Sequence, residues 1–380
     1  MDLQDYRKQI NEIDDRLVKA FEERMHVAAD IAAYKKQNNM AVLDVERERQ
    51  KLQDVADKLP EDLQDYGVTL YSLLMELSKN YQDHIISRKS ELGKTVQEAV
   101  SNTQKLFPER AMVACQGVTG AYSQLAADKL FKHPNIFYFS NFEGVFRAIE
   151  KGLCKYGVLP LENSTAGSVN KVYDLMMTHN FHIVRSVRLK IDHNLLVKPG
   201  TKLEDVKEIF SHEQAISQCS SFLQGLEGVK VTRCENTAMA AKMVSESERT
   251  DIAALASRSC IDLYHLECLK ADVQNQGNNY TRFICIGKDL EIFPGADRTS
   301  LMVVLSHRPG SLYKLLSRFY ALDINLTKLE SRPMPERDFE FMFYFDIEGS
   351  VYSPQFPMLL AELPDICEEF TYLGSYSEVM

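Results

Sequence analysis

Three basic residues near the N-terminus could together bind a small anion. At about 100° per residue, Arg24 and Lys35 point about 20° apart on a helix and lie about 16 Å apart along it, so both side chains can reach one dianion between them. Arg7 points about 100° away from Arg24 and lies about 25 Å from it along the axis. It can therefore complete such a site only from an antiparallel second copy of the chain.

Polar residues on the next two segments extend this pattern. The stretch "DVERE" contributes Asp44, Arg47 and Glu48. Ser78 and Gln82 are spaced i, i+4, so they share one face of a helix and can hydrogen-bond without adding charge. An alternative fits the same periodicity, namely a solvated helical dimerisation module whose cations extend their stems along apolar surface. Periodicity alone favours that alternative over a ligand site.

The elements that must carry these residues are helices. Apolar residues recur at three- and four-residue steps through residues 2–37, which predicts one helix about 50 Å long. Asp44 is expected to cap a second helix that ends near Lys58, and a third helix is expected over 61–87. Two short helices cannot cover so long an apolar stripe, so we expect the chain to pair with a second copy. The polar stretch 87–108 is expected to be a linker, in part still helical.

Over nearly all of residues 1–90, these polar positions resemble the AroQ-type chorismate mutase family in type and order. The resemblance implies an all-α intertwined dimer that rearranges chorismate to prephenate. It also implies that Arg24 and the other chain's Arg7 hold the two carboxylates of the substrate, and that Arg47 supports the site. Such a pericyclic reaction needs a folded substrate conformer and a cation near the developing charge, with no nucleophile or metal.

The same resemblance assigns the remaining contacts to chorismate. Lys35 and Gln82 would face the ether oxygen, where negative charge develops. Glu48 would hold the ring hydroxyl, and Asp44 and Ser78 would complete the site. An amide such as Gln82 is a donor at every pH, whereas a glutamate there would donate only when protonated.

The pattern changes to alternating short strands and helical segments over residues 111–288, which predicts α/β organisation. Four loops after strands carry small hydroxyl or amide residues: "GVTGAYS", "ENSTAGS", "SHEQA" and "ENTAMAA". Each loop alone is most simply a helix cap, but helix N-termini after strands also bind anions, and four in one domain favour a cleft. Thr281 and Arg282 in "NNYTRF" begin a predicted strand. They need not belong to a site, because threonine is common in strands and Arg282 could point to solvent.

The segments "GVTGAYS", "LPLENSTAGSV", "SHEQAISQC" and above all "TRF" resemble the prephenate dehydratase family. The resemblance implies two α/β lobes around a cleft, similar to periplasmic binding proteins, and a reaction that removes water and carbon dioxide from prephenate to give phenylpyruvate. Thr281 is implied to be required, because its hydroxyl can donate to the departing ring hydroxyl as an acid or through a proton relay. The weaker candidates for substrate contacts are Ser123, Asn163, Ser164, Thr237 and Arg282, the last as a carboxylate ligand.

The C-terminal residues 299–376 predict the order βαββαβ, which is the ferredoxin-like signature. By itself the Gly-Ser turn in "SHRPGSLYKLL" is most simply a helix cap. With this order, "GSL" and "ESRP" resemble the phenylalanine-binding motifs of ACT domains, although Ser311 and Tyr313 stand where the family usually has Ala and Val. The resemblance implies feedback inhibition by L-phenylalanine bound at a subunit interface. The implied contacts are Gly310, Ser311, Leu312, Glu330, Ser331, Arg332 and Pro333.

Composition excludes several other classes of protein. A net charge of -10 argues against a general nucleic-acid binder, so an anion site must be a local basic cluster. No apolar run approaches the about 20 residues of a membrane span, and the charged N-terminus is unlike a signal peptide. Eight scattered cysteines without a C-x-x-C pair are typical of reduced thiols in the cytoplasm. We therefore expect a cytoplasmic protein without metal or cofactor.

The chain resembles the bifunctional chorismate mutase–prephenate dehydratase family over nearly its whole length. The matching segments are, in order, 1–90, 109–288 and 299–376, with a linker at 91–108. The expected partners are chorismate and prephenate as substrates, L-phenylalanine as an inhibitor, and further copies of the chain in a dimer or larger oligomer. Two alternatives stay open. One is a dehydratase that prefers arogenate, and the other is a non-catalytic amino-acid sensor.

Overall fold

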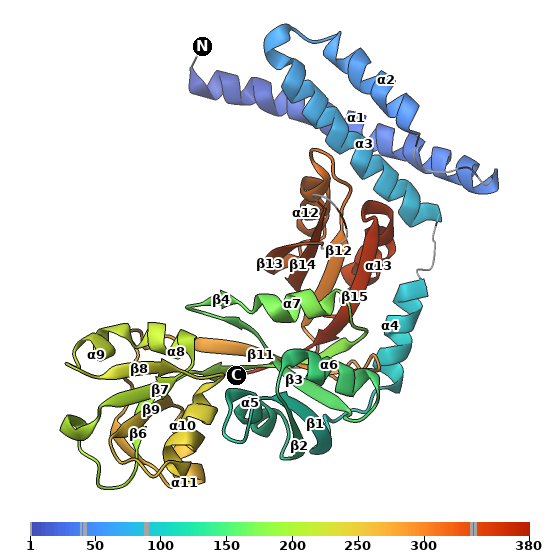
Figure 1. Ribbon diagram of the computed structural model, residues 1–380. Coiled ribbons are helices and arrows are strands. Elements are labelled where there is room, and N and C mark those ends of the chain that lie inside the picture. The colour runs from blue at the N-terminus through green and yellow to red at the C-terminus, as the bar shows by residue number, and fades with distance from the viewer. Residues whose placement is uncertain (1, 39, 41–43, 87–90, 335–336, 338–339) are drawn as a thin grey trace. The chain divides into compact units, whose positions relative to one another are not determined.

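The computed structural model describes residues 2–38, 40, 44–86, 91–334, 337 and 340–380 (Figure 1). It divides into two compact units. Met1–Lys94 and Pro357–Asp365 form one unit, and Thr95–Phe356 and Ile366–Met380 form the other.

The first unit consists mainly of the three predicted helices, α1 (Leu3–Gln37), α2 (Val45–Ala56) and α3 (Gln64–Ile86). Asp2 caps α1 in a capping box with Asp5, and Asp44 caps α2 by accepting a hydrogen bond from the backbone N–H of Arg47. The second helix ends slightly before the predicted position, and the third begins with the 3-10 turn η1 (Glu61–Leu63). Two residues of the predicted break "NNMA", Asn39 and Ala41, lie outside the described residues, as does Ser87, the last residue predicted for the third helix.

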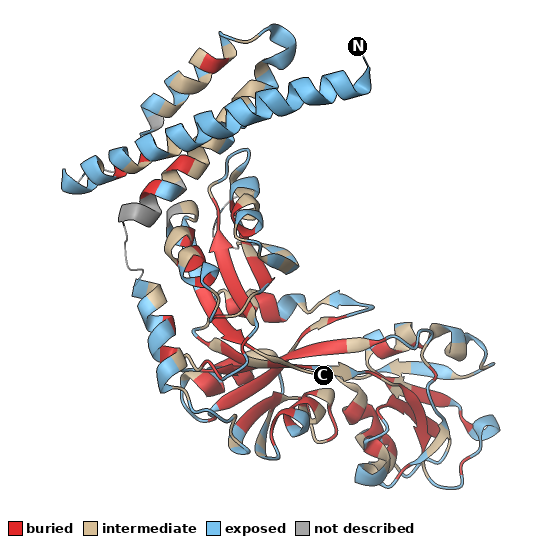
Figure 2. Cartoon of the chain, turned by 180° about the vertical axis from the view of Figure 1, so that it is seen from behind, coloured by how far each residue is buried: buried red, intermediate tan, exposed pale blue. Residues whose placement is uncertain are grey.

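The long helix α1 leaves most of its apolar stripe uncovered within one chain. Ala28 and Ala32 are buried where α1 packs against α3. Toward the N-terminal end the large apolar side chains are exposed, and Figure 2 shows this part of α1 almost wholly in the exposed colour. These exposed residues are Leu3, Tyr6, Ile10, Ile13, Leu17 and Phe21.

Most of the predicted linker is a helix and a docked segment. Helix α4 (Glu91–Asn102) is followed by Thr103, whose hydroxyl accepts a hydrogen bond from the backbone N–H of Ile292 at 3.0 Å. The ring of Phe107 packs against Phe131 and Phe293, with centroids 4.9 Å apart in both pairs. The segment from Thr103 to Phe107 is therefore fixed to the first lobe.

The first lobe is a mixed sheet in the order β16-β5-β11-β3-β1-β2, with β4 paired to β3. Its two core clusters lie on either side of the central strands, against α5 and α6. The strands are β1 (Arg110–Gln116), β2 (His133–Phe139), β3 (Tyr156–Asn163), β4 (Gly167–Ser168), β5 (His182–Lys190), β11 (Tyr280–Gly287) and β16 (Glu378–Val379), and the helices are α5 (Tyr122–Leu130), α6 (Phe142–Glu150) and α7 (Asn170–Met176).

The second lobe is a five-stranded sheet in the order β10-β6-β9-β7-β8. The chain enters this lobe between β5 and β6 and returns between β10 and β11, so two connections join the lobes (Figure 1). The strands are β6 (Asn194–Val197), β7 (Glu208–Ser211), β8 (Lys230–Arg233), β9 (Ile252–Ala256) and β10 (Glu267–Lys270), and the helices are η2 (Leu203–Asp205), α8 (Glu213–Gln218), α9 (Ser220–Gln224), α10 (Thr237–Glu246) and α11 (Cys260–Tyr264).

The C-terminal elements follow the predicted order βαββαβ: β12 (Arg298–Val304), α12 (Ser311–Ala321), β13 (Asn325–Pro333), β14 (Phe341–Glu348), α13 (Gln355–Ile366) and β15 (Glu369–Tyr376). Their sheet has the order β13-β14-β12-β15 and is antiparallel throughout. It shares a hydrophobic core with the first lobe, in which Tyr344 packs edge-on against Tyr173. Gly374, at φ 141°, lies so close to the backbone of Ile183 that no Cβ fits there.

In the part of the chain that the structure describes, no helix is long and apolar enough to cross a membrane. The described residues also contain no group of three or more His, Cys, Asp or Glu side chains placed to hold a metal ion.

Candidate functional site

The helical unit brings two of the predicted chorismate contacts together. The Arg24 guanidinium donates to the hydroxyl of Ser78 and, at 3.0 Å, to the backbone carbonyl of Leu74. The Ser78 hydroxyl donates in turn to the same carbonyl at 2.8 Å. Burial against α3 lowers the pKa of Arg24, which nevertheless stays a cation at neutral pH. Ser78 thus fixes the direction of a partly buried positive charge.

A lysine that the sequence analysis missed holds the predicted contact Glu48. The Lys79 ammonium lies 2.9 Å from the Glu48 carboxylate on α2 and 3.0 Å from the Glu76 carboxylate on its own helix. Burial lowers the pKa of Lys79, but the hydrogen bonds that it donates to the two carboxylates raise it above the ordinary value overall. Lys79 directly follows the predicted site residue Ser78. A charged residue at this position is the sequence signal that could have identified it.

The remaining residues predicted for this site differ in their surroundings. Gln82 is 7% exposed, and its Oε1 atom has no hydrogen-bond partner among the described residues. Lys35 is half-buried, whereas Arg7 and Asp44 are exposed. Arg47, the predicted supporting residue, donates to the side chain of Gln50 at 3.3 Å. With no partner among the described residues, the amide oxygen of Gln82 marks a buried polar position that a ligand or a water can occupy.

In the α/β unit, Asn163 and Thr281 face each other at the ends of two paired strands. Thr281 on β11 is the register partner of Asn163 on β3. The Asn163 amide nitrogen donates to the Thr281 hydroxyl oxygen at 2.8 Å, and both residues are buried. The Asn163 amide oxygen accepts from the backbone N–H groups of Thr165 and Ala166 at 3.1 and 2.9 Å.

These two backbone donors fix the direction of the whole network, because a backbone N–H can only donate. They require the oxygen of Asn163 on their side and its nitrogen on the side of Thr281. The same nitrogen donates to the Asn279 side-chain oxygen at 2.7 Å, and Asn279 donates to Gln218 Oε1 at 3.0 Å. The nitrogen of Gln218 then donates to the Thr165 hydroxyl at 2.8 Å. The Thr281 oxygen accepts from Asn163, so its own proton remains available to another acceptor.

A buried histidine completes the network from the connection between the lobes. His193 Nε2 lies 2.9 Å from Gln218 Oε1. Since that oxygen is an acceptor, Nε2 must carry the proton. Burial lowers the pKa of His193, which favours the neutral ring in this position. Four residues of this network were not among the predicted site residues: Thr165, His193, Gln218 and Asn279. Three of them lie in quoted segments, namely Thr165 in "LPLENSTAGSV", Gln218 in "SHEQAISQC" and Asn279 in "NNYTRF".

An open pocket of about 760 Å³ borders this network. Its walls come from the loop after β3, from α8 in the second lobe and from the connection that returns to β11. Burial lowers the pKa of His212 at the start of α8. The lining residues are Ser164, Thr165, Ala166, His212, Glu213, Gln214, Ser217, Gln218, Gln274, Asn275, Gln276 and Asn279.

The other predicted prephenate contacts lie in different places. The Ser164 hydroxyl lines the pocket but also donates to the Asn278 carbonyl and accepts from the Tyr280 N–H. Ser123 is buried in α5, and Thr237 is half-buried at the start of α10. Arg282 is 5% exposed, and it pairs with Asp346 on β14 and with Glu162 on β3. The guanidinium of Arg282 therefore has two protein carboxylates as partners.

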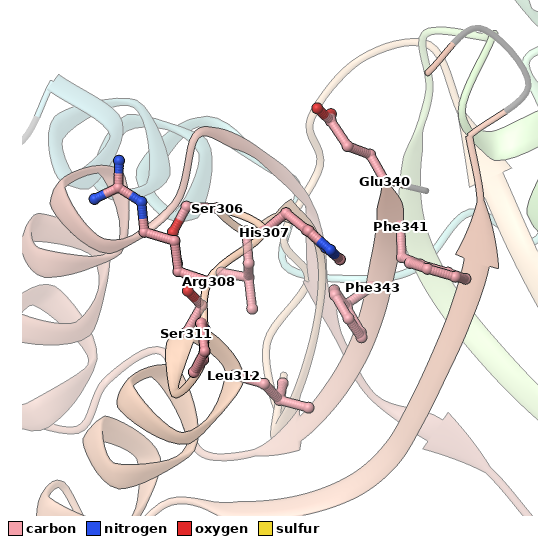
Figure 3. Close-up of a pocket in the computed structure, with 10 residues that line it drawn as sticks. Ser306, His307, Arg308, Ser311, Leu312, Glu340, Phe341 and Phe343 are labelled. Atoms are coloured by element: carbon pink, nitrogen blue, oxygen red, sulfur yellow. Dashed lines mark hydrogen bonds between the residues drawn. The ribbon is translucent and has the colours of Figure 1, made fainter. Parts of the chain in front are cut away.

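A second pocket, of about 360 Å³, lies in the C-terminal sheet beside the start of α12. Figure 3 shows Ser311 and Leu312 on the helix and Phe341 and Phe343 on β14. Gly310 precedes the helix with φ 86°, where a residue without a Cβ is favoured. The remaining lining residues are Leu305, Ser306, His307, Arg308, Pro309 and Glu340.

The structure does not bring the predicted "ESRP" residues to this pocket within one chain. Glu330 accepts a hydrogen bond from Ser168 in the first lobe. Arg332 donates to Asp174 on α7 at 2.9 Å. Ser331 and Pro333 continue the same strand, β13, which is an edge of the C-terminal sheet. Ser311 and Glu330 therefore lie in two separate environments.

Comparisons with known proteins agree with the division into a helical and an α/β region. The family model described as chorismate mutase type II matches residues 6–83, and the one described as prephenate dehydratase matches residues 113–291. The chain is 30% identical over 378 residues to a bifunctional chorismate mutase/prephenate dehydratase of Enterobacter agglomerans, covering 97% of this chain and 94% of that protein.

Two further similarities cover a smaller share of the chain. The chain is 36% identical over 314 residues to arogenate dehydratase/prephenate dehydratase 2 of Arabidopsis thaliana, which covers 80% of this chain and 81% of the relative. It also resembles the crystal structure of a prephenate dehydratase from Arthrobacter aurescens in complex with L-Phe. That match has a TM-score of 0.65 at 26% identity and covers 70% of this chain and 89% of the other.

Proposed function

Because the chain belongs to the family of bifunctional chorismate mutase/prephenate dehydratase proteins, we propose that it catalyses two consecutive steps of L-phenylalanine biosynthesis. The helical unit rearranges chorismate to prephenate. The α/β unit converts prephenate to phenylpyruvate with loss of water and carbon dioxide. The observation that carries the second activity is the hydrogen bond from Asn163 to Thr281, which leaves the threonine proton free.

The rearrangement of chorismate needs binding and charge stabilisation only. Arg24, aligned by Ser78, and Arg7 of the partner subunit hold the two carboxylates of the folded substrate. Lys35 and Gln82 stabilise negative charge that develops on the ether oxygen as the C–O bond breaks. Asp44 and Glu48 bind the opposite side of the substrate, where Glu48 accepts from the ring hydroxyl. Lys79 supports this last contact by holding the Glu48 carboxylate.

The dehydration begins with Thr281 donating its proton to the ring hydroxyl of prephenate. The ring C–O bond breaks and water leaves. The electrons of the bond to the ring carboxylate move into the ring as carbon dioxide departs, and the ring becomes aromatic. Thr281 recovers its proton from solvent through the adjoining pocket, so one proton is consumed per turnover. Formation of the aromatic ring provides the driving force, and a weakly acidic hydroxyl held in place is sufficient.

The C-terminal βαββαβ unit is the candidate regulatory domain of the ACT type. The resemblance of "GSL" and "ESRP" and the L-Phe named for the Arthrobacter structure support this proposal. Ser311 and Leu312 border the pocket beside α12, whereas Glu330 to Pro333 lie on β13, an edge strand of the C-terminal sheet. We propose that the edge strand of a second subunit completes the pocket. L-phenylalanine then inhibits if it binds the inactive state more tightly than the active one.

The uncovered apolar stripe of α1 supports an oligomer. A row of large apolar side chains along one long helix is a surface that a second copy of the same helix covers well. The pairing also supplies the second arginine that the mutase site needs. We propose a homodimer or a larger homo-oligomer in the cytoplasm, and light scattering of the purified protein tests its size.

One experiment tests both activities. The purified protein is supplied with chorismate, and prephenate and phenylpyruvate are followed with and without L-phenylalanine. Appearance of both products in sequence is the expected result. Absence of turnover with pure chorismate would support the non-catalytic sensor instead. The similarity to arogenate dehydratases favours a second candidate substrate, which a comparison of kcat/KM for prephenate and arogenate decides.

A further inference from the structure

Thr281 and Arg282 are neighbours on β11 and face opposite sides of the sheet, as successive strand residues do. Their partners on β3 are also successive residues that face opposite sides of the sheet. Asn163 is paired with Thr281 and Glu162 with Arg282. One face of this four-residue block carries the candidate proton donor, and the other meets the C-terminal sheet. The register shifts between Arg282 and Phe283, so the block ends at a β-bulge.

The C-terminal sheet holds the second face by a buried ion pair. Arg282 Nη2 donates to Asp346 Oδ2, and Asp346 on β14 is fully buried. The other oxygen of Asp346 accepts from Ser300, whose hydroxyl is also bonded to Tyr344 and Tyr376. Arg282 Nε lies 2.9 Å from the Glu162 carboxylate. Burial acts to lower the pKa of Arg282, but Asp346 raises it well above the ordinary value.

A second set of contacts joins the same two parts. Lys328 on β13 lies 3.1 Å from the Glu162 carboxylate and donates to the Ser168 hydroxyl at 2.8 Å. The loop from Asn163 to Ser168 lines the pocket with its residues Ser164, Thr165 and Ala166. Lys328 of the C-terminal sheet contacts Glu162, just before this loop, and Ser168, at its end.

We propose, on the basis of the proposed dehydratase function, that Arg282 is a positioning residue that acts through Asp346. The ion pair fixes the β3–β11 block against the C-terminal sheet, and this sets the distance between Asn163 and Thr281. The C-terminal sheet is then part of the support of the dehydratase site. A change in that sheet on ligand binding has a direct route to Thr281. This role differs from binding a substrate carboxylate, which the sequence suggested for Arg282.

The test replaces Asp346, which lies outside the pocket. Asp346→Asn keeps the shape of the side chain and removes its charge. Because misplacement of a catalytic group by a distant change can cost about 100-fold in rate, kcat for prephenate is expected to fall about 10- to 100-fold, with KM changed less than about threefold. The matched control is Glu348→Gln on the same strand, whose carboxylate contacts Arg298 and Asn325 at the surface. That control should leave kcat and KM unchanged.

A readout independent of turnover accompanies the kinetics. In protein labelled at the threonine methyl groups, the NMR signal of Thr281 should shift in Asp346→Asn and stay in place in Glu348→Gln. An unchanged kcat together with an unmoved Thr281 signal overturns the proposal. If wild-type protein does not turn over prephenate, the dehydratase assignment fails, and the methyl shift alone then decides the positioning role.

A second variant covers the case in which Asp346→Asn does not fold. Arg282→Lys keeps the positive charge but cannot contact both carboxylates in the same way. Positioning predicts a lower kcat with KM nearly constant and a shifted Thr281 signal. A raised KM with unchanged kcat means instead that Arg282 binds the substrate, and this overturns the inference. Circular dichroism and the mutase activity of each variant report whether the chain is folded.

Discussion

The amide nitrogen of Asn163 lies 2.8 Å from the hydroxyl oxygen of Thr281, and this hydrogen bond can run in one direction only. The Asn163 oxygen is already taken by the N–H groups of Thr165 and Ala166. The nitrogen therefore faces Thr281, whose oxygen accepts. The Thr281 oxygen is thus held in place while its proton is free. This arrangement suits a general acid that protonates the hydroxyl leaving prephenate.

Removal of the Thr281 hydroxyl should therefore abolish the dehydratase step alone. Thr281→Ala, or Thr281→Val with nearly unchanged shape, is expected to lower kcat for prephenate by about 10²- to 10⁴-fold, the usual contribution of general acid catalysis. Chorismate consumption should stay at the wild-type rate. Thr281→Ser retains a hydroxyl and serves as the control. Loss of both activities in a folded variant would contradict separate sites.

Asn163→Asp tests the direction of the bond with almost no change in volume. The new carboxylate can only accept, so Thr281 must donate to it and its proton is no longer available to the substrate. We expect kcat for prephenate to fall at least about 100-fold at neutral pH. Asn163→Ala should be less damaging than Asn163→Asp, because it leaves the threonine proton free. The opposite ranking in steady-state assays would show that the direction of this bond does not matter.

Histidine burial predicts that the α/β unit loses stability in acid. The pKa values of His182, His193 and His212 are all lowered, mainly because burial disfavours the charged ring. The unfolded chain then binds more protons than the folded one below about pH 6.5, so stability falls as the pH decreases below that value. Thermal melts between pH 8 and 5 measure the effect. His193→Gln should flatten the curve, and an unchanged curve would show that His193 does not contribute.

Lys79 should matter for the mutase reaction although it was not predicted to contact the substrate. Lys79→Met removes the ammonium that holds the Glu48 carboxylate at 2.9 Å. The loss of one charge-assisted hydrogen bond suggests a decrease of about tenfold in kcat/KM for chorismate. Lys58→Met, at an exposed position just after α2, is the control. Equal rates for both variants would mean that Glu48 is held by other groups.

The pocket beside α12 predicts where L-phenylalanine binds. Leu312 lines that pocket, and Leu312→Ala removes apolar contact worth about 1.5–3 kcal/mol when fully buried, so the dissociation constant should rise about 10- to 100-fold. Tyr313→Ala changes the next residue, which is 61% exposed and outside the pocket, and should not alter binding. Calorimetric titration measures both. Absence of phenylalanine binding to the wild-type protein would rule out the regulatory assignment.

Much of the fold could be predicted because its signals are local. Apolar periodicity and the predicted cap Asp44 mark the first two helices within one or two residues. Two strands, β2 and β16, have weak local signals. β2 begins with a histidine and a proline, and β16 is a two-residue strand that exists through its pairing with β5. The linker, predicted to be in part still helical, contains the helix α4. Its last part docks on the first lobe because Phe107 packs against Phe131 and Phe293, which lie far from it in the sequence.

The site could be predicted only where a motif marks it. Thr281 and Asn163 were identified from "TRF" and "ENSTAGS", and the strand register brings them together. The role of Gln218 depends on Asn279 and His193, which come from the two connections between the lobes and carry no shared sequence pattern. From the sequence, Arg282 was expected either to point to solvent or to bind a substrate carboxylate. Its partner Asp346 belongs to the C-terminal sheet, so the sequence near Arg282 does not reveal the ion pair. Such pairings depend on tertiary structure and leave no local periodicity.

The last prediction concerns the composition of the mutase site. If Arg7 of one chain and Lys35 of the other serve one chorismate, neither Arg7→Ala nor Lys35→Ala should have measurable mutase activity alone, and Lys35→Ala should still form the dimer. A mixed dimer has one site with both substitutions and one site with neither. Random exchange of subunits makes half of the dimers mixed, so the mixture should regain about a quarter of the wild-type activity. If both residues serve the site from the same chain, mixing restores nothing, because every site then carries one of the two substitutions. Dehydratase turnover, which should be unaffected in all samples, reports that the chains are folded and equally concentrated.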